Sequence, residues 1–441
     1  MRVWRCFFLV TVLCVCSPGA GATNAAAETT FVSAEGTEFS LDGRPFYYAG
    51  TNTYYLMVYA ADAALVAHVD EVLADAAAMG LAVVRTWAFN DGATQWNALQ
   101  TAPGVYDETV FQGLDYVLKK ADQQGIRLIL PLVNNWDDYG GMNQYVAWDA
   151  GYGNPPYASS HDDFYTDTDI KQWYKNHVSA ILNRVNTFNG RTYLNDPTVF
   201  AWELANEPRA TSDPSGDKMN DWISEMSAYV KSIDSNHLVT TGSEGFYDED
   251  TGPWYRNGSQ GVDFLRNHQV SDIDFCTVHI YSDYWGFDYA ASMDWISEHI
   301  TDAHDVIGKP IILEEFGKYR DAAKIEPGPS LQGTLGGDTA TRDQFFEGFY
   351  GTIYENDAGG SNFWILYHDT YPDYDGFGVY YPADSSTVEI IAAAADSMNG
   401  KGTNPAGLTA LSPWGVTLLA VAMVVVSLVM FKARRADEPE G

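Results

Sequence analysis

Short apolar runs alternate with longer amphipathic segments along most of this chain. The apolar runs are rich in Val, Ile, Leu and aromatic residues, as strands buried on both faces are. In the longer segments apolar residues recur every three or four positions, as on one face of a helix. The predicted strands cover residues 46–52, 82–87, 127–133, 199–204, 237–241, 275–280, 310–314 and 362–366. The predicted helices cover residues 62–79, 109–124, 169–186, 217–233, 293–307, 342–356 and 388–398.

Eight buried strands separated by helices predict an α/β protein with a parallel sheet covered on both faces. Eight is also the number of strands that closes a (β/α)8 TIM barrel, which we predict for residues 30–398 as one domain. An open doubly wound sheet is the alternative. It favours a Gly-rich phosphate turn after the first strand, and Gly50-Thr51-Asn52-Thr53 is not such a turn.

Both ends of the chain predict targeting segments outside this domain. Arg2 and Arg5 precede an apolar run at 6–16, and small residues at 20–22 or 25–27 offer a cleavage site, so residues 1–27 read as a secretory signal peptide. Residues 399–410 form a linker. The uncharged run 414–431 precedes three basic residues, which predicts a C-terminal transmembrane or sorting segment at 411–435. We expect the protein to be exported and anchored in the membrane at the cell surface. If the tail is removed, we expect it to be released to the extracellular space.

The net charge argues against one class of partner, and the cysteine content excludes one means of stabilising the fold. The formal net charge of −34 argues against nucleic acid as a partner, because a polyanion would be repelled. Three of the four Cys lie in the predicted signal peptide, so the mature chain keeps only Cys276 and cannot form an internal disulfide. We therefore expect packing to stabilise the folded chain. We also expect the protein to be a monomer.

Polar side chains gather where the predicted strands end, which is where a barrel carries its function. Asn206 and Glu207 follow the fourth strand, and Glu314 and Glu315 follow the seventh. Two carboxyls at the tips of buried parallel strands suit glycosidic bond cleavage, in which one protonates the leaving oxygen and the other attacks the sugar carbon. Side chains alternate along a strand, so only one of Glu314 and Glu315 can point into the barrel mouth, and the sequence alone leaves that choice open.

Other strand-end residues fit the same chemistry. Arg85 ends a Val-rich strand, where a guanidinium would keep a nucleophilic carboxylate ionised. His279 and Tyr281 share one face of a strand tip. Trp364 is a candidate floor for a sugar ring, with core packing as the alternative. Glu203 lies inside a predicted strand, where a charge needs a partner, and reads as structural.

Metal and serine-hydrolase chemistry receive little support from the sequence. It contains no His-x-x-x-His motif or Cys pair, and the acidic run at 247–250 is better explained as a solvated loop than as a calcium site. A Gly-x-Ser-x-Gly elbow after a strand is also missing. We predict no metal and no cofactor.

Several long stretches resemble glycoside hydrolase family 5. Within that family the chain is similar to the endo-β-1,4-mannanases of the plant-like and fungal-like group, over most of residues 31–381. The most specific stretches are WELANEPR at 202–209, LVNNWDDYGGMNQYVAW at 132–148, DIKQWYKNHVSAILNR at 169–184, DFCTVHIYSDYW at 274–285 and KPIILEEFGKY at 309–319. The relatives usually rely on disulfides, and the mature chain predicted here departs from them in that respect.

The resemblance implies a role for each matching residue. Glu207 would be the acid/base and Glu315 the nucleophile of a retaining reaction, with the carboxyls about 5–5.5 Å apart. Asn206 would hydrogen-bond the sugar 2-hydroxyl, while Arg85 and Tyr281 would orient and ionise Glu315. The remaining substrate-binding residues would be His279 lining the same subsite, Trp364 stacking beneath it, Arg209 on the leaving-group side, and Trp136 and Trp285 at neighbouring subsites.

Together these observations predict a mannan endo-1,4-β-mannosidase with a single catalytic domain. Its substrate and partner would be a β-mannan polysaccharide, namely mannan, glucomannan or galactomannan. A β-1,4-glucanase is an alternative, because the subfamilies share the catalytic residues. A non-catalytic surface carbohydrate-binding protein is a second alternative, which the complete catalytic set argues against.

Overall fold

The computed structural model describes residues 30–249, 251–320 and 340–402 and has a parallel eight-stranded sheet at its centre. The strands lie in the order β10-β9-β8-β5-β4-β13-β12-β11. They are β4 (Tyr48–Asn52), β5 (Val83–Arg85), β8 (Arg127–Pro131), β9 (Val199–Glu203), β10 (Leu238–Thr240), β11 (Cys276–Tyr281), β12 (Ile311–Gly317) and β13 (Gly360–Phe363). The two end strands meet where the backbone N–H of Asp274 donates to the carbonyl of Val239 at 2.8 Å. The predicted (β/α)8 barrel is therefore confirmed.

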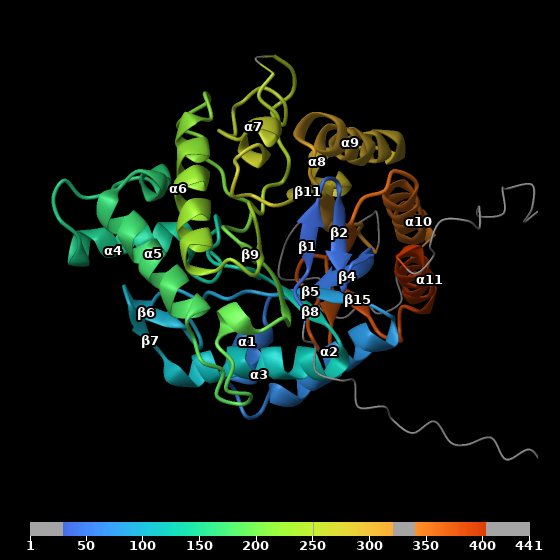
Figure 1. The fold of residues 1–441 in the computed structure, drawn as a ribbon, viewed down its shortest axis with the longest axis horizontal. Helices are drawn as coiled ribbons and strands as arrows, with labels where there is room; N and C mark the ends of the chain where they lie inside the picture. The colour runs from blue at the N-terminus through green and yellow to red at the C-terminus, as the bar shows by residue number, and fades with distance from the viewer. Residues whose placement is uncertain (1–29, 250, 321–339, 403–441) are drawn as a thin grey trace, which may run out of the picture.

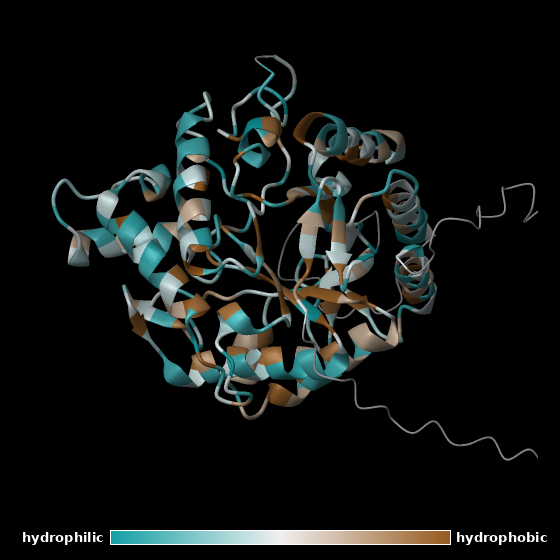
Figure 2. Cartoon of the chain, in the orientation of Figure 1, coloured by the Kyte–Doolittle hydropathy of each residue, from teal (hydrophilic) through white to brown (hydrophobic). Residues whose placement is uncertain are grey.

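Helices surround the strands (Figure 1), and hydrophobic residues are concentrated in the strands at the centre (Figure 2). The main ones are α2 (Val66–Ala78), α3 (Glu108–Gln124), α5 (Thr168–Leu182), α6 (Asp217–Ile233), α9 (Tyr289–Thr301), α10 (Ala340–Glu355) and α11 (Ser385–Lys401). Helix α3 shows why such segments fold. The Asp107 side chain accepts from Thr109 N–H at its start, Gly125 ends it at φ 70°, and its apolar face is buried.

A small antiparallel sheet at the N-terminus closes one end of the barrel. It consists of β1 (Ser33–Glu35), β2 (Glu38–Leu41) and β3 (Arg44–Pro45). Phe39 of β2 is 1% exposed, and its ring centroid lies 5.3 Å from that of Phe200 and 5.3 Å from that of Phe275. This aromatic cluster fills the end of the barrel at which the strands begin, so the opposite end is left open for function.

The sequence missed elements that lie in the connections. These are α1 (Leu56–Ala60), α4 (Gly141–Tyr152), α7 (Phe264–His268), α8 (Ser282–Trp285) and the short strand pairs β6 (Gln100–Ala102) with β7 (Val105–Tyr106) and β14 (Leu366–Tyr367) with β15 (Val379–Tyr380). The predicted eighth strand, 362–366, is divided between β13 and β14 by a cis peptide between Trp364 and Ile365. The predicted helix 293–307 continues beyond α9 as a π-turn over Asp302–Ile307.

The predicted signal peptide at 1–27 and the predicted membrane segment at 411–435 lie outside the described residues, as does most of the linker at 399–410. Within the part of the chain that is described, no helix combines the length and apolar character needed to cross a bilayer. Cys276 is buried and free.

Candidate active site

A cleft of about 710 Å³ opens at the carboxyl ends of the barrel strands. Aromatic and carboxylate side chains line it, a composition suited to a polymer of sugar rings. The lining residues include Tyr54, Trp87, Asn134, Trp136, Asn206, Glu207, Arg209, Glu244, Tyr281, Trp285, Glu315, Trp364, Tyr374, Asp375 and Phe377. All but two of the residues that the sequence assigned to the site are in this lining. The two exceptions, Arg85 and His279, lie fully buried beneath it.

Glu207 lies just beyond the tip of β9, in a backbone conformation that is rare for its residue type. Its φ is 50°, in the left-handed region, and its N–H donates to the carbonyl of Gly242 at 2.9 Å. The side chain receives a hydrogen bond from Trp136 Nε1 at 2.7 Å and lies 2.8 Å from His279 Nδ1. The carboxyl of Glu207 is therefore held in one position at the floor of the cleft.

Glu315 is the acid that β12 presents to the cleft, whereas Glu314 is fully buried below it. Arg85 Nη1 donates to Glu315 Oε1 at 2.5 Å, and the Tyr281 hydroxyl donates to Oε2 at 2.5 Å. Glu314 Oε2 lies 3.2 Å from His279 Nε2. This arrangement agrees with the expectation that only one of the adjacent carboxyls reaches the mouth while the other finds a buried partner.

Arg85 connects Glu315 and Asn206 of the cleft to the strands below. Its guanidinium binds both oxygens of Glu203, at 2.7 and 2.6 Å, as well as Glu315. It also donates to Asn206 Oδ1 at 2.7 Å and to Asn52 Oδ1 at 3.0 Å. Glu203 thus has the partner that a charge inside a strand requires, and Asn206 is fixed with an amide edge facing the cleft.

His279 is surrounded by carboxyls. Burial alone would lower its pKa, but Glu315, Glu207 and Glu314 reverse that effect and raise the pKa of the imidazole well above its usual range. The ring is therefore an imidazolium that donates from Nδ1 to Glu207 and from Nε2 to Glu314. Its place behind the two cleft carboxyls differs from the expected lining position, because β11 turns the side chain into the barrel.

Glu207 and Glu315, which lie beside the His279 imidazolium, have perturbed pKa values. Burial opposes ionisation of Glu207, but the hydrogen bond and charge of His279 outweigh it and hold the pKa of Glu207 below its usual range. Burial raises the pKa of Glu315, although His279 and Arg85 counteract it. This order is the reverse of the raised pKa expected for a general acid at Glu207, because the nearest cation to Glu207 is an imidazolium. The two groups are close enough to titrate as a pair.

Arg209 lines the cleft together with Trp136 and lies among three aromatic rings. The Arg209 guanidinium carbon lies 5.0 Å from the ring of Trp136, 5.0 Å from Phe246 and 5.9 Å from Trp254. Glu244 accepts from its Nε and Nη2, both at 2.7 Å, and burial raises the pKa of Glu244 to about 7. With most of its donors engaged, Arg209 holds Trp136 flat against the cleft.

Trp364 forms the floor on the opposite side. Its ring stacks on Tyr54, with centroids 5.6 Å apart and an interplanar angle of 14°. Its Nε1 donates to Asp375 Oδ2 at 2.6 Å. Asp375 belongs to the segment between β14 and β15, which also brings Tyr374 and Phe377 to the cleft. Sequence reasoning missed this segment, since Asp375 lies nine residues beyond the end of the predicted eighth strand, where no strand-end pattern marks it. It also left Glu244 unassigned, although Glu244 follows the fifth predicted strand.

The centre of the cleft contains a cluster of potential metal-ligand atoms, and hydrogen bonds account for it. One oxygen each from Glu207 and Glu315 and a nitrogen of His279 all lie within 4.8 Å of one another, which is also a spacing that a metal ion could use. Both His279 nitrogens face carboxylates, and both oxygens of Glu315 face donors. Two carboxyl oxygens within 4.8 Å of each other match the short separation of a retaining glycosidase, about 5–5.5 Å, rather than the roughly 6.5–9.5 Å of an inverting one.

Comparisons with known proteins agree with this geometry. Residues 29–372 match the family described as GH family 5 β-mannosidase-like. Mannan endo-1,4-β-mannosidase 7 of Arabidopsis thaliana is 43% identical over 359 residues, which cover 78% of this chain and 79% of that protein. Mannan endo-1,4-β-mannosidase 8 of Oryza sativa is 42% identical over 365 residues, covering 78% and 93%. The crystal structure of an endo-1,4-β-mannanase from Rhizomucor miehei superposes with a TM-score of 0.73 at 35% identity, covering 84% of this chain and 100% of that one.

Proposed function

This chain belongs to glycoside hydrolase family 5, in its β-mannosidase-like group, and we propose from that membership and the cleft geometry that it is a retaining endo-1,4-β-mannanase. The observation that carries the proposal is the pair Glu207 and Glu315, with oxygens within 4.8 Å, at the tips of two barrel strands in an aromatic cleft. The substrate is a β-1,4-linked mannan, which the cleft binds as a polymer passing through it.

In the first step Glu315 attacks the anomeric carbon while Glu207 protonates the leaving glycosidic oxygen. The bonds from Arg85 and Tyr281 leave Glu315 ionised and fix its oxygens in the direction of attack. Asn206 accepts from Arg85 and donates to Asn134 Oδ1 at 2.9 Å, so its second amide N–H is available for the sugar 2-hydroxyl. In the second step Glu207 deprotonates the water that releases the sugar from Glu315.

Glu207 takes from His279 the proton that it then delivers to the leaving oxygen. The 2.8 Å hydrogen bond between Glu207 Oε1 and His279 Nδ1 holds one proton, which lies on the imidazolium in the free enzyme. When a sugar covers the cleft, loss of water disfavours the separated charges and favours the neutral acid beside a neutral imidazole. His279 is thus a positioning residue and proton store rather than part of the sugar-binding surface.

Trp364 supports the sugar that is cleaved, and Trp136, Trp285 and Arg209 bind sugars on either side of it. The support for this assignment is that the four residues line the same cleft as the two carboxyls. Trp136 also donates to Glu207, so sugar binding at that ring and proton delivery are coupled.

The activity is tested by measuring the reducing sugar that the full chain releases at low and at high salt. The substrates are linear mannan, glucomannan and carboxymethyl cellulose. We expect release from the two mannans, with retention of configuration at the new reducing end in an NMR time course. Glu315→Ala should abolish release and, with azide added, form a glycosyl azide, because a small anion can replace the missing nucleophile. Activity on cellulose alone would assign a β-1,4-glucanase. Binding to mannan without turnover by the folded wild type would assign a carbohydrate-binding protein.

We further propose that the protein is exported and tethered to the membrane by its C-terminal tail. The support is the sequence pattern of the two ends, both outside the described residues. N-terminal sequencing of the mature protein and fractionation of cells test it. A chain that keeps Met1, or that stays with the intracellular soluble proteins, contradicts it.

A further inference from the structure

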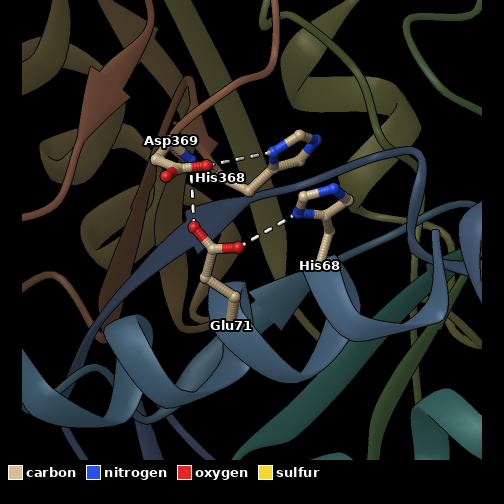
Figure 3. A group of neighbouring side chains, drawn as sticks. All are labelled: His68, Glu71, His368 and Asp369. Atoms are coloured by element: carbon tan, nitrogen blue, oxygen red, sulfur yellow. Dashed lines mark hydrogen bonds and ion pairs between the residues drawn. The ribbon is translucent and has the colours of Figure 1, made fainter. Parts of the chain in front are cut away.

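A second cluster of potential metal ligands lies away from the cleft. It joins His68 and Glu71, one turn apart on α2, to His368 and Asp369, which directly follow β14 (Figure 3). One donor atom from each of the four side chains lies within 4.8 Å of the others. None of the four lines the cleft, and the proposed hydrolysis uses none of them.

The two imidazoles present the same nitrogen to the carboxylates. His68 Nδ1 lies 3.0 Å from Glu71 Oε2, and His368 Nδ1 lies 4.0 Å from Asp369 Oδ1. Figure 3 shows both rings with these nitrogens on the side of the acids. The rings stack with centroids 3.8 Å apart and an interplanar angle of 16°. Two chain segments that are distant in sequence therefore converge on a shared set of nitrogen and oxygen donors.

His368 presents a lone pair to the cluster. The backbone N–H of Thr370 donates to its Nδ1 at 3.3 Å, so a lone pair is on that nitrogen and the proton is on Nε2. Nε2 is buried without a hydrogen-bond partner among the described residues.

Both oxygens of Glu71 face donors in this cluster. The Asp369 N–H donates to Oε1 at 3.1 Å, and His68 Nδ1 lies 3.0 Å from Oε2. Because an ionised carboxylate only accepts, the proton of His68 lies on Nδ1 in that contact, and an ion bound at this nitrogen would displace the proton.

We propose that His68, Glu71, His368 and Asp369 bind a divalent transition-metal ion. Two imidazoles with two carboxylates suit Zn²⁺ in tetrahedral coordination, whereas Ca²⁺ and Mg²⁺ prefer sites made of oxygen alone. Ligand atoms about 2.0–2.2 Å from a tetrahedral ion lie roughly 3.5 Å apart, so the cluster must contract. The side chains of His68 and Asp369 are 26% and 69% exposed and can move, while the buried His368 stays in place.

The ion would fasten α2 to the start of the segment between β14 and β15. That segment supplies Tyr374, Asp375 and Phe377 to the cleft, and Asp375 holds the ring of Trp364. Two backbone N–H groups already join its first residues to other elements. His368 N–H donates to the Tyr55 hydroxyl at 3.3 Å, and Asp369 N–H donates to Glu71. Metal binding would therefore order a wall of the cleft from outside it.

Calorimetric titration of the full chain, freed of metal by a chelator, with ZnCl2 tests the proposal. We expect saturable binding, at least about tenfold weaker in His68→Ala and in Glu71→Gln, and a rise in melting temperature with Zn²⁺ that both variants lose. His161→Ala is the matched control. His161 also contacts a carboxylate, Asp162, at 2.8 Å, and its side chain is likewise 26% exposed. Its Zn²⁺ affinity should equal that of the wild type.

Three outcomes would overturn the proposal: no Zn²⁺ binding, equal binding of Mg²⁺ and Ca²⁺ by an acidic surface, or unchanged Zn²⁺ binding in both variants. Circular dichroism of each variant establishes that it is folded. If His68→Ala alone fails to fold, Glu71→Gln decides the question, because it keeps the shape of the side chain and removes only the charge.

Discussion

Removing Arg85 should destabilise the protein far more than removing a surface arginine. Arg85→Met deletes five hydrogen bonds to Glu203, Glu315, Asn206 and Asn52 and leaves the fully buried Glu203 without its cation. Breaking a buried ion pair from one side costs about 3–5 kcal/mol. The remaining carboxyl must stay charged in a low-dielectric site or take up a proton, and burial already raises the pKa of Glu203 to about 8. Glu203→Met should cost less, because Arg85 keeps the carboxylate of Glu315 at 2.5 Å as a counter-ion.

A double-mutant cycle separates this electrostatic effect from simple loss of packing. In Arg85→Met/Glu203→Met neither charge remains, so we expect the double variant to be more stable than the sum of the single costs predicts, by about 2–3 kcal/mol. Urea unfolding of the full chain, compared at its midpoint with the slope held constant, measures each cost. Arg266→Met is the control, since its pair with Asp217 is 39% and 67% exposed and worth at most about 1 kcal/mol.

If Arg85→Met lowers the free energy of unfolding no more than Arg266→Met does, the buried ion pair does not stabilise the protein as proposed. The same conclusion follows if the costs of the two single changes add in the double variant. Additive costs would mean that Arg85 and Glu203 stabilise the barrel independently, through packing. Arg85 would then be needed at the cleft but not for the charge balance beneath it.

Three further predictions follow from the pKa shifts and contacts of single residues. We expect His279→Gln to narrow the pH profile of kcat/KM: the alkaline limb moves to lower pH, because only the Glu207 carboxyl is then left to hold the catalytic proton, and the acid limb moves to higher pH, because Glu315 loses a cation that favours its ionisation; an unchanged alkaline limb would contradict this. Burial raises the pKa of Asp91 from 3.8 to about 7, so its contribution to stability is complete below about pH 4 and is lost progressively as the pH rises to about 7. Asp91→Asn should therefore flatten the fall in melting temperature over that range, and an unchanged slope would place the effect elsewhere. Trp364→Phe keeps an apolar ring but removes the 2.6 Å bond to Asp375, so kcat/KM on mannan should fall roughly tenfold, as judged from the cost of an unpaired buried carboxyl.

The barrel and the two carboxyls could be predicted because each rests on a local signal. Strands buried on both faces appear as short apolar runs, and an acid directly after such a run must lie at the rim. Glu207, close behind the fourth predicted strand, fits this condition. At the seventh strand the local signal left Glu314 and Glu315 open, and only the resemblance to the family selected Glu315. The helix predicted at 217–233 has the bounds of α6 for the same reason, since an acidic first turn and an amphipathic repeat mark it.

What the sequence left undetermined depends on packing between distant segments. The placement of Asp375 follows from the two-residue strands β14 and β15, whose pairing no periodicity reveals. The depth of His279 depends on how β11 turns within the barrel, where a register shift separates Val278 from His279. The cluster of His68 with His368 joins residues 300 positions apart, so no motif of fixed spacing could identify it.

The buried thiol of Cys276 makes the protein its own reporter of unfolding. The residue is fully buried at the start of β11, and burial raises the pKa of its thiol, so a thiol reagent reaches it only when this strand leaves the barrel. The labelling rate of the peptide containing Cys276, followed by mass spectrometry, therefore reports how often the strand that carries His279 and Tyr281 opens. Substrate analogues and metal ions can be compared on that scale without an introduced probe.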